Sequence, residues 1–178
     1  PLHSSAASDV YKRQGYATGM FGKWHLGDAE GRYPTDQGFD EWYGIPNSSD
    51  QAFWPDSDSF QKDAGVEFTR VMTSTRNQKP KKHEVYGRVK RATIDREITD
   101  YALEFIARKA ETKKPFFAYL PYTQTHEPVD AHPDFKGSTG NGSFADVLAQ
   151  TDSYVGELIA MIDDLGICLL YTSPSPRD

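Results

Sequence analysis

The fold of this chain follows from one stretch near its start, GYATGMFGKWHLG, which runs from Gly15 to Gly27. Residues Tyr16–Trp24 are aromatic, interrupted by glycines and without a helical period, which predicts a buried strand running into a loop. Lys23 and His25 stand two positions apart where that strand should end, among glycines that let the backbone turn sharply. We therefore expect any chemistry of this region at the end of the strand.

Lys23 and His25 suit the handling of an anion together with a proton. A lysine offers a compact point charge to a sulfuryl or phosphoryl oxygen, and a histidine transfers protons near neutral pH. On these residue types alone, the simpler interpretation is a surface lysine beside a histidine whose ring bonds a backbone carbonyl.

Downstream, the sequence predicts a helix, a strand and a second helix. Apolar residues recur at helical spacing from Ile94, with Thr93 as the expected cap and with Asp95 and Glu97 in the first turn. Lys113, Lys114 and Pro115 should end this helix, and the apolar run Phe116–Leu120 then predicts a buried strand. The second helix, ending at Gly166 with another strand expected after it, is indicated by Phe144, Val147, Leu148, Val155, Leu158, Ile159 and Ile162.

Strands that alternate with helices predict an α/β fold with a mixed or parallel sheet and flanking helices. In such sheets, ligand groups gather on the loops beyond the carboxyl ends of the strands. His126 lies in such a loop, within YTQTHEP, and Pro121 and Pro128 should stiffen the backbone around it. It is a candidate second proton donor; the alternative is a loop histidine held by Glu127 or Thr125.

Residues Asp28–Phe60 are rich in Gly, Pro, Asp and Ser, which predicts a long surface excursion anchored by Phe39, Trp42 and Tyr43. Aromatic faces in this segment could contact a sugar or aryl group, although anchoring of the loop explains them more simply. The candidates for such contacts are Trp42, Tyr43, Phe53 and Trp54. The carboxylates lack the spacing of a calcium loop, so we interpret as solvated Asp28, Asp36, Asp40, Asp50, Asp56 and Asp58.

Three basic features receive no role. The run Lys79–Lys82, KPKK, is expected to be a solvated loop. His83 stands in a basic segment that should be exposed, and His132 precedes a proline in a predicted turn.

The composition narrows the class of protein. The chain has 178 residues, 37% of them hydrophobic and 26% charged, as in globular proteins, and no apolar run approaches the length of a membrane span. A net charge of −6 argues against a nucleic-acid partner. The single cysteine, Cys168, permits no internal disulfide and no thiolate metal cluster.

Both ends differ from the middle of the chain. SSAASDVYKRQ, at Ser4–Gln14, resembles the in-frame translation of a transposase sequencing adapter, and CLLYTSPSPRD, at Cys168–Asp178, resembles that of its partner adapter. We therefore expect residues 1–14 and 168–178 to be read-through rather than native sequence. Residues 15–167 are then the native part, expected to be a partial catalytic domain.

Four strings together resemble the sulfatase family of the alkaline-phosphatase-like superfamily, and more closely its arylsulfatase A-like members. They are GYATGMFGKWHLG, YPTDQGFDEWYGIPNSSDQ, KKPFFAYLPYTQTHEP and SFADVLAQTDSYVGELIAMIDDLGI. The first resembles the second signature of the family. The third resembles the strand and loop that bear its second active-site histidine. Their order along the chain is also that of the family, so the resemblance covers almost all of residues 15–167.

This resemblance implies hydrolysis of a sulfate ester by a formylglycine beside a Ca²⁺ ion. Carried over by position, Lys23 would contact the sulfate and the formylglycine, His25 would assist proton movement at the formylglycine hydroxyl, and His126 would bind sulfate and protonate the leaving oxygen. The Cys-x-Pro-x-Arg motif and the Asp-Asn-Gly metal segment of the family are not in this sequence. We therefore expect the nucleophile and the metal ligands outside this chain, and we expect the chain by itself to be inactive.

The implied substrate is a small-molecule or carbohydrate sulfate ester. Two alternatives stay open: a phosphodiesterase or phosphonate monoester hydrolase of the same superfamily, and a catalytically dead sulfatase-like binding protein. Export is common in the family, so a periplasmic, secreted or lysosomal protein is compatible with it.

Overall fold

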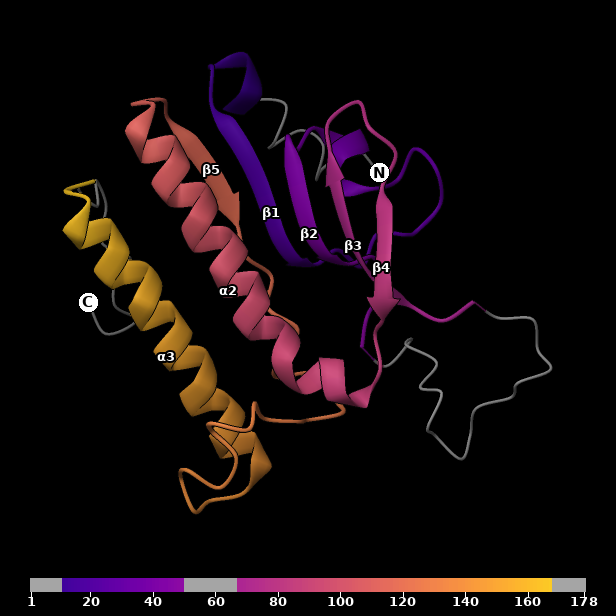
Figure 1. Cartoon of the computed structure of the whole chain (residues 1–178), viewed down its shortest axis with the longest axis vertical. Helices are drawn as coiled ribbons and strands as arrows, with labels where there is room; N and C mark the ends of the chain where they lie inside the picture. The colour runs from indigo at the N-terminus through magenta and orange to yellow at the C-terminus, as the bar shows by residue number, and fades with distance from the viewer. Residues whose placement is uncertain (1–10, 50–66, 168–178) are drawn as a thin grey trace, which may run out of the picture.

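A computed structural model describes residues 11–49 and 67–167 of the chain. These residues form a five-stranded mixed sheet in the order β4-β3-β2-β1-β5, flanked by helices (Figure 1), which confirms the predicted α/β class. Its strands are β1 (Ala17–Lys23), β2 (Glu41–Ile45), β3 (Arg70–Thr75), β4 (Lys81–Val85) and β5 (Phe116–Tyr119). β1 is parallel to both β2 and β5, whereas β3 is antiparallel to β2 and β4.

β1 supplies side chains to a core on each face of the sheet, because neighbouring residues of a strand point to opposite faces. Phe21 joins one cluster with Tyr43 and Phe105, while Met20 joins the other with Trp42. All five are at most 4% exposed. The strand predicted at Tyr16–Trp24 is therefore confirmed as a central, doubly covered strand.

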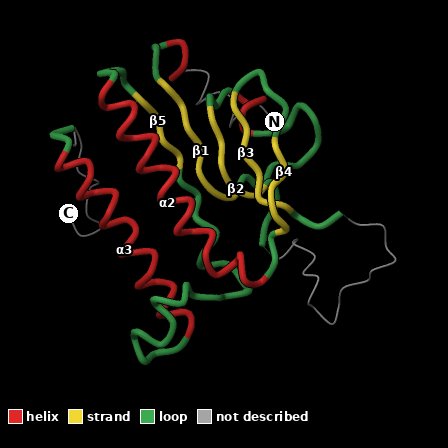
Figure 2. The backbone as a smooth tube through the Cα atoms, in the orientation of Figure 1, coloured by secondary structure: helices red, strands yellow, loops and turns green. Residues whose placement is uncertain are grey.

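Two long helices cover one face (Figures 1 and 2). Helix α2 (Arg88–Glu111) lies across β1, β2 and β5, and α3 (Ser143–Asp164) packs on α2. The second predicted helix is thus confirmed, but only part of its apolar surface is buried. Val147 and Tyr154 face the interior, whereas Phe144 and Leu148 are 55% and 48% exposed.

The opposite face is covered by residues 24–40, which include the short 3-10 helix η1 (Pro34–Gln37). Trp24 and Phe39 from this segment pack edge to face beside Met20 and Trp42. The surface excursion predicted from Asp28 is interrupted by strand β2, while its predicted anchors Phe39, Trp42 and Tyr43 are buried as expected. The part of that excursion beyond Ser49 falls outside the described residues.

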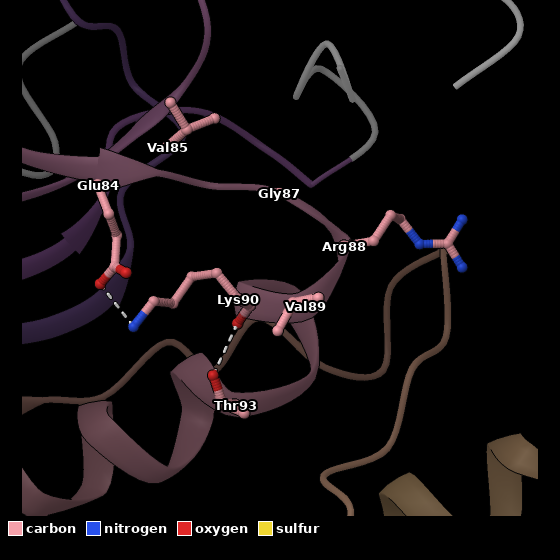
Figure 3. A pocket seen from close by; sticks show the side chains of 7 residues that line it. All are labelled: Glu84, Val85, Gly87, Arg88, Val89, Lys90 and Thr93. Carbon is pink, nitrogen blue, oxygen red and sulfur yellow. Dashed lines mark hydrogen bonds and ion pairs between the residues drawn. The ribbon is translucent and has the colours of Figure 1, made fainter. Parts of the chain in front are cut away.

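The first helix begins earlier than predicted. It starts at Arg88, after Gly87 as N-cap, so Thr93 lies inside the helix and does not cap it. Its hydroxyl donates to the carbonyl of Lys90 at 3.4 Å (Figure 3). The end near Lys113 was predicted correctly, since Thr112 is the C-cap.

Two other expectations change. Phe116–Tyr119 forms a strand, but β5 pairs with β1 alone among the described strands and Tyr119 is 45% exposed, so it is not the buried strand expected. Lys81 and Lys82 belong to β4 rather than to a loop; both are exposed, as suits an edge strand. The strand expected after Gly166 falls outside the described residues.

In the described part of the chain, no helix is both long enough and apolar enough to cross a membrane.

Candidate functional site

The loops that follow β1 and β5 meet at one edge of the sheet. The two strands are parallel neighbours, so their carboxyl ends lie together. Lys23 is the last residue of β1, and its backbone N–H donates to the carbonyl of Pro121 at 2.8 Å. The loop that carries His126 therefore leaves β5 directly beside Lys23.

Glycine allows this close approach. A Cβ at Gly22 would stand 2.1 Å from the carbonyl oxygen of Pro121, and one at Gly44 in β2 would stand 1.9 Å from the carbonyl oxygen of Gly22. Contacts this short are impossible for real side chains, so both positions require glycine. Their φ angles of +136° and +153° also lie where other residues are strained.

His25 is presented by an unusual backbone conformation. Its φ of 59° is in the left-handed region, which non-glycine residues adopt rarely and often at functional sites. Its N–H donates to the carbonyl of Pro46 at 2.9 Å, which ties the loop to the end of β2. Trp24, between His25 and Lys23, is buried and donates its indole N–H to the carbonyl of Arg32 at 2.7 Å. These contacts hold His25 at the surface of the site.

The side chains of Lys23 and His25 make no hydrogen bond or ion pair with any residue in the described ranges. Lys23 is half-buried and His25 is exposed. The interpretation in which the ring of His25 bonds a backbone carbonyl therefore does not hold for residues 11–49 and 67–167. Both cationic or protonatable groups are available to a ligand.

His126 is exposed, and its ring is oriented by its own loop. Its Nδ1 donates to the backbone carbonyl of Glu127 at 2.8 Å. A carbonyl oxygen only accepts, so Nδ1 carries the hydrogen, and in the neutral ring Nε2 is the basic nitrogen. The histidine is thus held by Glu127, as the alternative interpretation proposed, but through the backbone and in a way that keeps Nε2 basic.

Two residues that the sequence reasoning did not select fasten this loop to α2. Arg91 is fully buried and donates to the carbonyl of His126 at 2.6 Å. Asp95 is 2% exposed and accepts the backbone N–H groups of Thr123 and Gln124 at 2.9 and 3.0 Å. Burial raises the pKa of Asp95, and these hydrogen bonds and the charge of Arg91 oppose the rise. Asp95 therefore does not act at the start of the helix, as predicted, but as an acceptor for the loop.

A second contact joins the two sides of the site. The hydroxyls of Ser49 and Tyr86 lie 3.0 Å apart and are both buried. Ser49 lies three positions after Pro46, whose carbonyl accepts the N–H of His25. Tyr86 lies two positions before the first residue of α2. The backbone supports of His25 and of His126 are thus parts of one packed region.

Of the aspartates interpreted as solvated, Asp28 and Asp36 are exposed as expected, whereas Asp40 is half-buried and engaged in local structure. Asp40 accepts hydrogen bonds from the backbone and hydroxyl of Thr18, and Asp36 accepts one from the N–H of Tyr33. The ring of His83 lies 2.8 Å from the hydroxyl of Thr73. The described residues contain no group of three His, Cys, Asp or Glu that could hold a metal ion. Three of the aspartates lie outside those residues: Asp50, Asp56 and Asp58.

Of the four aromatic residues proposed to contact the substrate, two are buried and two lie outside the described residues. Trp42 and Tyr43 are only 2% and 4% exposed, so they anchor the sheet and cannot face a substrate. Phe53 and Trp54 lie outside the described residues.

Two cavities lie near the sheet edge. One of about 310 Å³ borders the loop after His25, and its polar lining includes Asp28, Asn47 and Arg70. A wider one of about 570 Å³ lies at the start of α2, where Lys90 pairs with Glu84 (Figure 3). The wider cavity contains none of the three predicted site residues, so its size alone gives it no role.

Comparison with known proteins decides the family. The sequence profile of the family described as Sulfatase matches residues 1–173. The chain belongs to the sulfatase family. That match extends into residues 1–14 and 168–173; the adapter origin of the two ends stays a prediction.

Individual relatives agree with this family. The chain is 30% identical to N-acetylgalactosamine-6-sulfatase of Canis lupus familiaris over 94% of its own length and 31% of that protein. It is 31% identical to arylsulfatase A of Homo sapiens over 94% of its own length and 34% of that protein. The chain therefore spans about a third of the length of these relatives.

Solved structures, one of them titled a sulfatase, share the fold. The crystal structure of PsFucS1 sulfatase from Pseudoalteromonas sp. matches with a TM-score of 0.80 and 24% identity, covering 89% of this chain and 34% of that one. The structure of Ps i-CgsB in complex with k-i-k-neocarrahexaose matches with a TM-score of 0.69 and 26% identity, over 93% of this chain and 38% of that one.

Proposed function

We propose that this chain is part of a sulfatase that hydrolyses sulfate esters, and that Lys23, His25 and His126 belong to its active site. The observation that carries the proposal is the convergence of two loops at one sheet edge. Lys23 ends β1 half-buried, the loop after β1 carries His25, and the loop after β5 carries His126. The hydrogen bond from the Lys23 backbone N–H to the carbonyl of Pro121 joins the two loops.

The three side chains would divide the work by their chemistry. Lys23, half-buried at the end of β1, would bind a sulfuryl oxygen and stabilise the negative charge that grows there. His25, exposed on the strained turn, would move a proton at the nucleophile. His126 would bind sulfate and protonate the leaving oxygen, since a protonated ring donates from Nε2 while Nδ1 stays bonded to Glu127.

The family resemblance also implies a formylglycine nucleophile and a Ca²⁺ ion. The described residues do not offer a calcium site, because no suitable group of ligands comes together among them. The Cys-x-Pro-x-Arg motif and the Asp-Asn-Gly segment of the family do not occur in residues 15–167. On that ground we propose that the ion and the formylglycine are held by other parts of the protein, and that residues 15–167 alone are inactive. The roles assigned to Lys23, His25 and His126 do not depend on where the metal binds.

The substrate class that we propose is an aryl or carbohydrate sulfate. Support comes from the relatives, one of which is named an arylsulfatase and one an N-acetylgalactosamine-6-sulfatase.

The reaction class is tested on the full-length protein that contains this segment. Hydrolysis of p-nitrophenyl sulfate, p-nitrophenyl phosphate and N-acetylgalactosamine 6-sulfate is compared at equal enzyme concentration. We expect turnover of at least one sulfate ester well above that of the phosphate. Faster turnover of the phosphate would instead identify a phosphatase-like member of the superfamily, and no turnover of any ester would identify a catalytically dead protein.

The site assignment is tested by Lys23→Ala and His126→Ala in the same full-length protein. Each should lower kcat by about 10²-fold or more, because each removes a charge-stabilising or proton-transferring group. Lys136→Ala and His83→Ala are matched controls, since both side chains are exposed and lie on other segments. Near-normal rates in both site variants would refute the assignment.

A further inference from the structure

The loop around His126 rests on a buried pair of charged residues in α2. Arg91 and Asp95 are four positions apart, so they lie on the same face of the helix one turn from each other. They are 0% and 2% exposed. Burying an arginine and an aspartate is costly unless both are fully hydrogen-bonded, and here nearly all of the partners come from one loop.

Arg91 binds the loop on both sides of Glu127. Its Nη2 donates to the carbonyl of His126 at 2.6 Å, and its Nε donates to the carbonyl of Pro128 at 3.1 Å. The same guanidinium also bonds the carbonyl and hydroxyl of Thr123 and the side-chain oxygen of Gln124. A guanidinium carries five N–H donors and reaches this set of acceptors with one Nη2 hydrogen shared between two of them, whereas a lysine ammonium carries only three.

Asp95 completes the arrangement from the next turn of α2. Its Oδ1 accepts the N–H and the hydroxyl of Thr123 at 2.9 and 2.8 Å, and its Oδ2 accepts the N–H of Gln124 at 3.0 Å. The pair thus holds donors and acceptors of the same loop at once. Because the helix both donates to and accepts from the loop, these hydrogen bonds fix the conformation of the loop backbone as well as its distance from the helix.

The consequence for His126 is local. Arg91 fixes the carbonyls of residues 126 and 128, and the carbonyl between them, that of Glu127, accepts the Nδ1 hydrogen of His126. If the backbone turned at Glu127, the ring would lose the bond that keeps Nε2 as its basic nitrogen. Groups that orient a functional histidine in this way commonly change activity by about 10- to 100-fold when removed.

We propose that Arg91 and Asp95 are positioning residues, which set the tautomer and direction of the His126 ring from inside α2. The expected effect on turnover rests on the proposed function. The expected effect on the His126 tautomer is independent of that function and is measured in the chain alone.

The variants are Arg91→Lys and Asp95→Asn. Arg91→Lys keeps the positive charge but loses the planar guanidinium. Asp95→Asn keeps one carbonyl oxygen as the acceptor for Thr123 and places an NH₂ group, which cannot accept, against the N–H of Gln124. The controls are Arg96→Lys and Asp100→Asn, in the same helix. Arg96 is also doubly paired, with Asp100 and Glu157, but bonds no residue of the His126 loop among the described contacts.

The first measurement is made on the chain as it stands. Long-range ¹H–¹⁵N spectra of the His126 ring report its tautomer, and urea unfolding reports stability. We expect the Nδ1–H form in the parent and in both controls, and a mixture of tautomers in both loop variants. If Arg91→Lys does not fold, the milder Asp95→Asn decides the question.

The second measurement is made on the full-length sulfatase. Both loop variants should lower kcat by about 10-fold or more, because the His126 ring is misdirected while Lys23 is intact. A change in tautomer without a fall in kcat, or a fall in kcat without a change in tautomer, overturns the proposal. If His126→Ala itself leaves kcat unchanged, the proposed function fails, while the tautomer measurement still decides the local claim.

Discussion

Replacing Gly22 by alanine should damage the centre of the site without touching any of its functional side chains. The new Cβ would lie 2.1 Å from the carbonyl oxygen of Pro121 and 2.8 Å from its carbonyl carbon. Ordinary carbon–oxygen contacts are about 3.3 Å or longer, so the loop must move by roughly 1 Å. That movement breaks the hydrogen bond between Lys23 and Pro121, which joins the loops after β1 and β5.

The expected loss has two parts. Alanine at positive φ costs roughly 1–2 kcal/mol, and a buried backbone donor left without its acceptor costs about 1–3 kcal/mol more. We expect a total of about 3 kcal/mol, measured by urea unfolding of the chain followed by tryptophan fluorescence. With a denaturant slope of about 2 kcal/mol per molar, the midpoint should fall by roughly 1.5 M.

Gly31→Ala is the matched control. Gly31 has a φ of +80°, but a Cβ there would meet nothing within 4 Å. This variant should lose only the backbone part, about 1–2 kcal/mol. Equal losses in the two variants would refute the close approach of Pro121 as the reason for a glycine at position 22.

Two further predictions concern the stability of the fold. The hydrogen bonds from Thr139 and Gly137 hold the pKa of Asp146 below its usual value, so this carboxylate stabilises the fold above that value and the contribution disappears as the pH falls through the lowered pKa. Asp146→Asn should therefore lower the free energy of unfolding at pH 7 but not in strong acid, whereas the exposed Asp152→Asn should have little effect at either pH; a gap that persists in acid would contradict this. Phe105 is fully buried, with its ring 5.4 Å from that of Phe21, so Phe105→Ala should cost about 3–5 kcal/mol. Val89→Ala, at a residue 85% exposed, should stay within about 0.5 kcal/mol, and similar losses from the two variants would contradict the core described above.

The parts of the fold that could be predicted are those with a clear local pattern. β1 ends at Lys23, one residue before the predicted end at Trp24. The range of α3 contains every apolar residue that predicted it, although Val155 and Ile159 among them are exposed. β2 was missed because EWYGI is only five residues long and is nearly continuous in its burial, so it shows no alternation. The antiparallel β3 and β4 were missed as well. β4 carries the charged residues of an exposed edge, which composition alone cannot distinguish from a loop.

The start of α2 was missed for a different reason, and that reason concerns the site. The buried residues of this helix follow one stripe: Arg91, Ile94, Asp95, Ile98, Thr99, Ala102, Phe105 and Ile106. A pattern search that treats charged residues as solvent-facing begins the stripe at Ile94. Continued at the same spacing, the stripe already includes Arg91 and Asp95, so two charges occupy positions where helical periodicity demands apolar side chains.

A charged pair in an apolar stripe requires partners that periodicity cannot reveal. Those of Arg91 and Asp95 come from residues 123–128, about thirty positions further along the chain. No local pattern links the two segments, because they are brought together only when β5 pairs with β1 and α2 packs across both. Thus the sequence could indicate Lys23, His25 and His126 as separate candidates, but the support of His126 follows only from the tertiary structure. The sequence signal that could have been used is the presence of charged residues at buried positions of the stripe. Where an amphipathic helix buries an arginine and an aspartate one turn apart, the loop that satisfies both should be sought first, since a fold that bears that cost holds the loop in one conformation.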